Sequence, residues 1–226
     1  MDWSRIPVIS YVFFSLFLLA TLVHLVFCFF ELELPRKITK GMTTLMLGIA
    51  VVCAIPTEPL PYIGLFLGMA GDVALLKKHK VWPFVTGLVL FLIGHIVYVV
   101  EYVLLCAPVH WGVIVGIILY AVLSPFLFAQ ISRRVVHQKK LVVGGAFYLD
   151  VLSLALIVPI VACALGKVDY LLLCVFGAMS FLLSDIILTI TMFKRDIRRR
   201  DFYIMFTYLL AQALIAVGFV MTILRG

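Results

Sequence analysis

Long apolar runs fill almost the entire chain and limit its fold more than any other feature. A helix needs about 20 apolar residues to cross a bilayer. We interpret eight runs as spans: Pro7–Phe30, Gly41–Ile55, Leu60–Leu76, Trp82–Leu105, Trp111–Ile131, Leu141–Leu165, Tyr170–Phe193 and Phe202–Leu224. The runs are continuous rather than alternating, which excludes a β-barrel. We therefore predict an all-α polytopic membrane bundle of eight transmembrane helices, with residues 1–226 as a single integral-membrane domain.

Composition agrees with a membrane protein. Hydrophobic residues make up 65% of the chain and charged residues 13%, whereas soluble domains are about 45–50% apolar. The first run is too long for the apolar segment of a cleavable signal peptide, so we interpret it as a span. The five cysteines lie in or near apolar runs without ligand-like spacing, which is typical of small buried hydrophobes.

The net charge of +7 is explained by topology and anionic lipid rather than by nucleic acid. Most Lys and Arg residues fall in four segments, residues 36–40, 77–80, 133–140 and 194–200, and the opposite side receives Arg5, Lys167 and Arg225. The positive-inside rule places the four basic segments in the cytosol and both termini on the other side. The endoplasmic reticulum and a bacterial inner membrane are both open as the host membrane.

Two aspartates, Asp72 and Asp185, interrupt apolar runs. A carboxylate inside a bilayer costs about 2.5–3.5 kcal/mol on insertion scales, and chains tolerate it mainly inside a bundle or cavity. Small residues accompany each aspartate at helical spacing and let helices approach closely: Gly64, Gly68 and Gly71 in one run, Gly177, Ser180 and Ser184 in the other. We expect both aspartates to point into the bundle, in its cytosolic half. The alternative is a hydrogen bond that only joins helices.

An internal duplication is a further alternative. Gly64-x6-Gly71-Asp72 matches Gly177-x6-Ser184-Asp185, and the two runs would cross the membrane in the same direction. This match predicts two parallel repeats of four helices. Glycine is common in membrane helices, so the bundle without repeats stays open.

Other polar residues within the runs have both structural and functional interpretations. His95 lies near the middle of the fourth run and either satisfies packing or assists the aspartates. Gln212 either fixes a water or substrate oxygen or bridges helices. Asp150 is a third acid at a depth similar to that of Asp185. We expect His24 and Glu101 nearer the non-cytosolic side, where a structural role is favoured.

Metal and nucleophile chemistry are poorly supported. Asp72, Asp185 and His95 could supply three ligands, but HxxxH and HExxH motifs are absent from the sequence, so we predict no metal. Ser184 lacks the G-x-S-x-G elbow of serine hydrolases. No organic cofactor is predicted either.

Four motifs together resemble the YhhN family of integral-membrane lysoplasmalogenases, which have eight spans. They are Gly71-Asp72, the segment from Phe84 through Gly87-Leu88 and Phe91 to Gly94-His95-x2-Tyr98, Phe181-x2-Ser184-Asp185, and Tyr208-x2-Ala211-Gln212. Each motif is weak alone, but their order and spacing across residues 64–215 are fairly specific. Lys40-Gly41 departs from the Lys-Pro that often starts the second helix of the family, which affects helix entry more than chemistry.

The resemblance implies hydrolysis of the vinyl ether bond of lysoplasmalogen to a fatty aldehyde and glycerophosphoethanolamine or glycerophosphocholine. This chemistry needs one neutral acid and one ionised carboxylate, as in glycosidases. We assign these two roles to Asp72 and Asp185, in an order the sequence leaves open, with His95 positioning water or tuning the pair. The expected substrate-binding residues are Gln212, Tyr98, Tyr208, Ser184, Tyr148, Lys77 and Arg195, with Lys78 nearby.

The expected partners are a lysophospholipid and the bilayer, and homo-oligomers are left open. A proton-coupled transporter or lipid carrier is the alternative function, because buried acids in paired repeats also form proton relays. A scaffold without chemistry is the third reading of the sequence.

Overall fold

The computed structural model describes residues 6–77, 81–105, 118, 151–161, 163, 170–193 and 197–225. Within these ranges the regular structure is entirely helical, which confirms the predicted all-α class. The elements are α1 (Val8–Phe29), α2 (Glu33–Ala54), α3 (Pro59–Ala74), a 3₁₀ turn (Leu75–Lys77), α4 (Val81–Leu105), a helix over Val151–Val161, α7 (Leu171–Phe193) and α8 (Arg200–Arg225).

Five of these helices, α1, α2, α4, α7 and α8, are long and apolar enough to cross a membrane. The helix α3 is apolar but shorter, at 16 residues. The predicted fifth span, Trp111–Ile131, lies outside the described residues apart from residue 118, and the sixth is described mainly over 151–161. A bundle of eight spans and an internal duplication therefore stay predictions.

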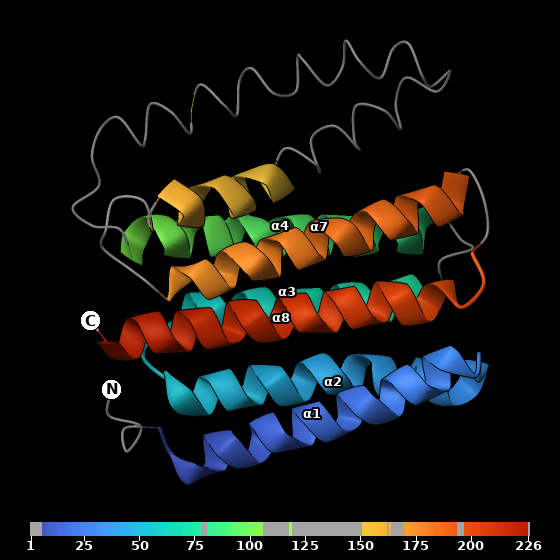
Figure 1. Cartoon of the computed structure of the whole chain (residues 1–226), viewed down its shortest axis with the longest axis horizontal. Helices are drawn as coiled ribbons and strands as arrows, with labels where there is room; N and C mark the ends of the chain where they lie inside the picture. The colour runs from blue at the N-terminus through green and yellow to red at the C-terminus, as the bar shows by residue number, and fades with distance from the viewer. Residues whose placement is uncertain are drawn as a thin grey trace.

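Helices that follow one another in the chain pack side by side as antiparallel hairpins. The pairs are α1 with α2, α3 with α4, and α7 with α8, and α8 also contacts α1, α2 and α3 (Figure 1). Short connections between antiparallel neighbours are the usual topology of helix bundles. The first residue of α1 and the last residue of α8 lie at the same end of the bundle (Figure 1). The starts of α2 and α8 lie at the opposite end, here called the basic end, which carries Arg36, Lys37, Lys40, Arg199 and Arg200.

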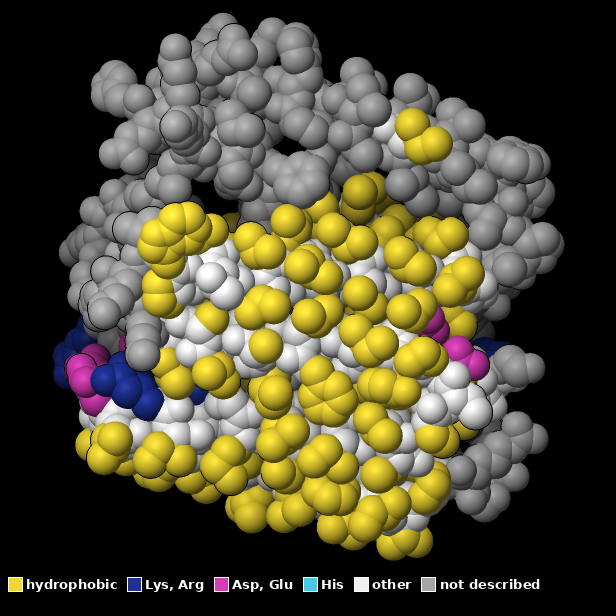
Figure 2. Space-filling model, turned by 180° about the vertical axis from the view of Figure 1, so that it is seen from behind, with side chains coloured by type: hydrophobic (Ala, Val, Ile, Leu, Met, Phe, Trp, Pro, Cys, Tyr) yellow, Lys and Arg dark blue, Asp and Glu magenta, His cyan; other side chains and the backbone are white. Residues whose placement is uncertain are grey.

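The outer surface is apolar along the length of the helices. Figure 2 shows one face covered by hydrophobic side chains, with the charged side chains of the described residues at its two ends. Leu19 and Leu22 of α1 are 59% and 64% exposed, and Phe176 of α7 is 53% exposed. Apolar patches of this extent are typical of a surface that faces lipid.

The predicted start of the second span was wrong by about two turns. The helix α2 begins at Glu33 rather than at Gly41, so Arg36, Lys37 and Lys40 lie on a helix and not in a loop. Pro35 is compatible with this start because the first turn of a helix has no intrahelical partner for its N–H groups. Polar residues in these first turns hid the helix from a search for apolar runs.

Small residues line the contacts between helices, as the sequence predicted. A Cβ on Gly71 would lie 2.9 Å from the Phe91 ring of α4, and one on Gly177 would lie 2.6 Å from Ile215 of α8. The Ser180 hydroxyl donates to the Thr207 carbonyl of α8 at 2.8 Å. Close backbone approach therefore joins α3 to α4 and α7 to α8.

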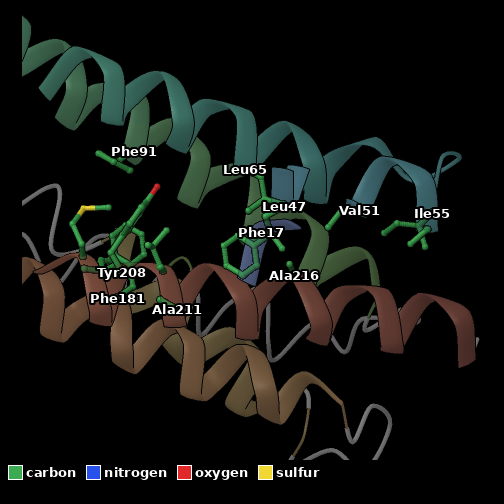
Figure 3. Packing of buried hydrophobic residues seen from close by; sticks show 14 of the residues in the cluster. Phe17, Leu47, Val51, Ile55, Leu65, Phe91, Phe181, Tyr208, Ala211 and Ala216 are labelled. Carbon is green, nitrogen blue, oxygen red and sulfur yellow. The ribbon is translucent and has the colours of Figure 1, made fainter. Parts of the chain in front are cut away.

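The hydrophobic core lies between these hairpins and contains side chains from α1, α2, α3, α4, α7 and α8. Figure 3 shows part of this core, in which the Phe91, Phe181 and Tyr208 side chains come together at one end and Phe17, Leu47 and Leu65 lie farther along α8.

Candidate active site

A cavity of about 310 Å³ opens among the helices near the basic end. Six helices contribute to its wall, α1, α2, α3, α4, α7 and α8. The lining includes two carboxyls predicted from the sequence, Asp72 of α3 and Asp185 of α7, together with Lys40 of α2. Two acidic side chains from distant parts of the chain therefore share one chamber.

Asp72 is held by the helix α2 beside it. Its side chain is 3% exposed, and Oδ1 lies 3.2 Å from the ammonium of Lys40. The Thr44 hydroxyl donates to Oδ2 at 3.4 Å. Lys40 and Thr44 are four residues apart and so lie on one face of α2, where both reach the same carboxyl.

The Tyr208 hydroxyl enters this cluster from α8. It interacts with Asp72, Thr44 and Gln212, and Figure 3 shows it pointing away from its own helix. Among the described residues it has no partner at regular hydrogen-bond geometry. A buried hydroxyl in this position is suited to hold an oxygen atom of a ligand beside Asp72.

Asp185 lines the cavity from α7 and is partly buried. Its neighbour Ser184 is 3% exposed and also lines the cavity, but its hydroxyl donates to the Ile204 carbonyl at 3.1 Å. Ser184 therefore fixes α7 against α8 at the level of the site.

Aromatic rings form the apolar inner wall. Phe91 lies 6.0 Å from Phe181 and 5.8 Å from Tyr208 between ring centroids, and Phe181 lies 5.6 Å from Tyr208, with all three pairs edge to face. All three rings line the cavity. This wall is suited to contact a hydrocarbon chain.

His95 lies behind this wall rather than in it. Its ring packs edge to face on Phe181 with centroids 4.3 Å apart, and it is absent from the cavity lining. Its Nδ1 lies 2.8 Å from the Phe91 carbonyl oxygen. A carbonyl only accepts, so Nδ1 carries the proton and Nε2 is a bare acceptor. Within the described residues, Nε2 has no hydrogen-bond partner.

Gln212 and Tyr98 lie deeper than the cavity. The Tyr98 hydroxyl donates to Gln212 Oε1 at 3.2 Å, which joins α4 to α8. Neither residue lines the cavity. Their connection to the site runs through the Tyr208 hydroxyl, which interacts with Gln212.

The cations and acids at the rim of the cavity form ion pairs that the sequence analysis missed. Arg36 of α2 pairs with Asp201 of α8, and Lys37 Nζ lies 3.0 Å from Glu33. From the sequence, the basic residues of this segment are explained by topology and anionic lipid. Their spacing held a usable signal, because positions 33, 36, 37, 40 and 44 fall on one face of a helix.

Several predicted site residues are not placed by the structure. Tyr148, Asp150, Lys78 and Arg195 lie outside the described residues, and the Lys77 side chain is not described. Their expected roles stay predictions.

The expected position of His24 was wrong. His24 lines the cavity at the basic end, because the first helix runs toward Arg36 and residue 24 lies in its last third. Its Nδ1 lies 2.7 Å from the Thr39 hydroxyl and its Nε2 lies 3.4 Å from the sulfur of Cys28. Both ring nitrogens are thus engaged by neighbouring side chains.

In the part of the chain that the structure describes, no three His, Cys, Asp or Glu side chains converge as metal ligands would. The arrangement instead offers two carboxyls, an ammonium and a hydroxyl around a cavity with an aromatic inner wall. These groups are suited to acid–base chemistry on a lipid.

Comparison with known proteins identifies a family. No curated protein and no solved structure matches the chain. The family model described as the YhhN family matches residues 35–219, which includes α3, α4 and α7 and most of α2 and α8. The chain is a member of the YhhN family.

Proposed function

We propose that this protein is a lysoplasmalogenase, which hydrolyses the vinyl ether bond of 1-alkenyl-glycerophosphoethanolamine or 1-alkenyl-glycerophosphocholine. The observation that carries the proposal is the placement of Asp72 and Asp185 in the wall of one cavity, whose inner wall is aromatic and whose rim is charged. Membership of the YhhN family, whose members resemble lysoplasmalogenases, supports the same reaction.

The reaction suits a pair of carboxyls. One carboxyl donates its proton to the β-carbon of the vinyl ether, and the π electrons form the new C–H bond. The resulting oxocarbenium ion is attacked by water, from which the other carboxylate removes a proton. The hemiacetal then gives its hydroxyl proton back to the first carboxylate while the second carboxyl protonates the glycerol oxygen. The C–O bond breaks to give aldehyde and alcohol, and both carboxyls return to their starting states.

The rest of the cavity supplies binding and orientation. The rings of Phe91 and Phe181 contact the alkenyl chain, and the Tyr208 hydroxyl holds the ether or glycerol oxygen. Gln212 and Tyr98 support Tyr208 from behind. His95 either positions the attacking water or holds the Phe181 ring in the cavity wall. The cations at the rim hold the phosphate.

The proposed orientation places the basic end of the bundle in the cytosol, following the distribution of Lys and Arg. The host membrane is then the endoplasmic reticulum in a eukaryote or the inner membrane in a bacterium. The cavity would receive lipid from the cytosolic leaflet.

Purified protein in detergent tests the proposal with a panel of vinyl-ether and ester lysolipids, with aldehyde release as the readout. We expect aldehyde only from the vinyl ethers. Asp72→Asn and Asp185→Asn should each lower kcat by about 10²–10⁴-fold, the range for loss of a general acid or base. Glu101→Gln is the matched control, because Glu101 is a buried carboxyl of α4 that does not line the cavity.

Two results would overturn the proposal. One is the absence of aldehyde from any vinyl ether with folded, monodisperse protein. The other is full activity in both asparagine variants. Proton-coupled uptake of a solute into liposomes without aldehyde release would favour a transporter instead.

A further inference from the structure

The ion pair between Lys40 and Asp72 joins a buried acid to the rim of the cavity. The Asp72 side chain is 3% exposed, while that of Lys40 is 18% exposed. The two ends of the Arg36–Asp201 pair are similarly exposed, at 19% and 22%, and the Lys37–Glu33 pair is largely exposed, at 46% and 74%. Lys40 thus contacts the buried Asp72 and also reaches toward the rim of the cavity, where an anionic head group would arrive.

Lysine is suited to exchange one anion for another. Its ammonium is a compact charge with three donors on a flexible four-carbon stem, so rotation of its side chain can turn it from one oxygen to another. Arg36, Lys37 and Arg200 line the cavity beside Lys40 and add to the attraction for a phosphodiester. An anion at this rim competes with Asp72 for the Lys40 ammonium.

Loss of Lys40 would change the charge balance around Asp72. The groups in contact with the Asp72 carboxyl are Lys40 and Thr44 of α2 and Tyr208 of α8. The other ionisable or hydrogen-bonding side chains that share its cavity are His24 of α1, Glu33, Arg36 and Lys37 of α2, Ser184 and Asp185 of α7, and Arg200 and Asp201 of α8. Lys40 is the cation in contact with the carboxyl. A carboxyl in an apolar cavity without a cation beside it favours its neutral, proton-carrying form.

We propose that Lys40 makes cleavage depend on the substrate phosphate, by moving from Asp72 to the phosphodiester when the lipid binds. This inference rests on the proposed function and deepens it. Asp72 then takes up a proton from the bulk solvent and becomes the donor to the vinyl β-carbon, while Asp185 stays ionised and removes the proton from the attacking water. Binding energy from the remote phosphate is in this way used at the reacting bond.

The experiment separates the phosphate from the reacting bond. The first substrate is a lysoplasmalogen, and the second is a 1-alkenylglycerol that has the same vinyl ether but no phosphate. Dimethyl phosphate, a phosphodiester monoanion, is added in trans. We expect wild-type protein to cleave the alkenylglycerol slowly and to be stimulated roughly tenfold or more by dimethyl phosphate, the effect of a charge-assisted hydrogen bond.

Lys40→Met tests whether Lys40 carries this effect. We expect the variant to lose the stimulation by dimethyl phosphate, and to cleave the alkenylglycerol without phosphate faster than wild type, since no ammonium then opposes the proton on Asp72. A merely structural role would lower both activities together. Arg225→Met is the matched control, because it removes one positive charge at the other end of the bundle, where Arg225 lies over the Tyr170 ring. It should keep the stimulation.

The outcomes separate this inference from the proposed function. If wild type cleaves both vinyl ethers equally well and dimethyl phosphate has no effect, the exchange by Lys40 is overturned while the lysoplasmalogenase stands. Persistent stimulation in Lys40→Met overturns it as well. If neither vinyl ether is cleaved, the proposed function itself fails. The wild-type phosphate titration can overturn the exchange even if the variant does not fold.

Discussion

The Tyr98 hydroxyl donates a hydrogen bond to Gln212 across 114 residues of sequence, and it does so directly beside the glycines of α3. A Cβ on Gly64 would collide with the Tyr98 ring, and one on Gly68 would lie 3.2 Å from Gln212 Nε2. The small residues of α3 therefore make room for the polar pair that supports Tyr208 from behind.

Gly64→Ala should destabilise the protein by about 1–3 kcal/mol, the usual cost of overpacking. The Tyr98 ring is fully buried and has little room to move away. Thermal unfolding in detergent measures the change. Gly41→Ala is the matched control on α2, because its Cβ would meet only the exposed Val73 side chain, at 3.3 Å. Equal unfolding temperatures for the two variants would contradict this account of Gly64.

Tyr98→Phe removes the donor to a buried amide oxygen. We expect a loss of about 1–3 kcal/mol in stability, because Gln212 Oε1 is left without a partner in an apolar interior. Gln212→Leu removes the acceptor. The double variant should cost less than the sum of the two single changes, by an interaction energy of about 1 kcal/mol. Strict additivity would show that the two residues do not support one another.

His95→Asn separates the two nitrogens of the imidazole. The asparagine amide can replace Nδ1–H as donor to the Phe91 carbonyl, but it has nothing at the position of Nε2. If Nε2 holds a water for the reaction, the variant should fold normally and lose about 10²-fold in kcat. Circular dichroism and aldehyde release are the two measurements. A folded variant with wild-type kcat would restrict His95 to packing against Phe181.

The ion pair between Arg36 and Asp201 fastens the start of α2 to the start of α8 at the mouth of the cavity. Arg36→Asp should lower stability by about 1–2 kcal/mol, because it places two carboxylates together at a partly buried site. The exchanged pair, Arg36→Asp with Asp201→Arg, should recover most of this loss in the unfolding temperature. No recovery would mean that the contact contributes little.

The length and continuity of the apolar runs alone determined the class of the fold. The runs predicted α1, α3, α4, α7 and α8 closely, since a spanning helix must satisfy its backbone internally and match the bilayer in length. The glycines and serines beside Asp72 and Asp185 predicted close helix contacts, which the structure confirms. The family motifs already indicated Asp72 and Asp185 as candidate site residues.

Only the tertiary structure decided which side chains meet. Lys40 reaches Asp72, and Arg36 reaches Asp201 165 residues away, because α2 packs against both α3 and α8. Spacing within one helix defines a face of that helix, but not which other helix the face contacts. Without knowledge of these contacts, the polar first turns of α2 resembled a loop. For the same reason the depth of His95 was predictable, whereas its place behind Phe181 depended on how α4 is rotated against α7.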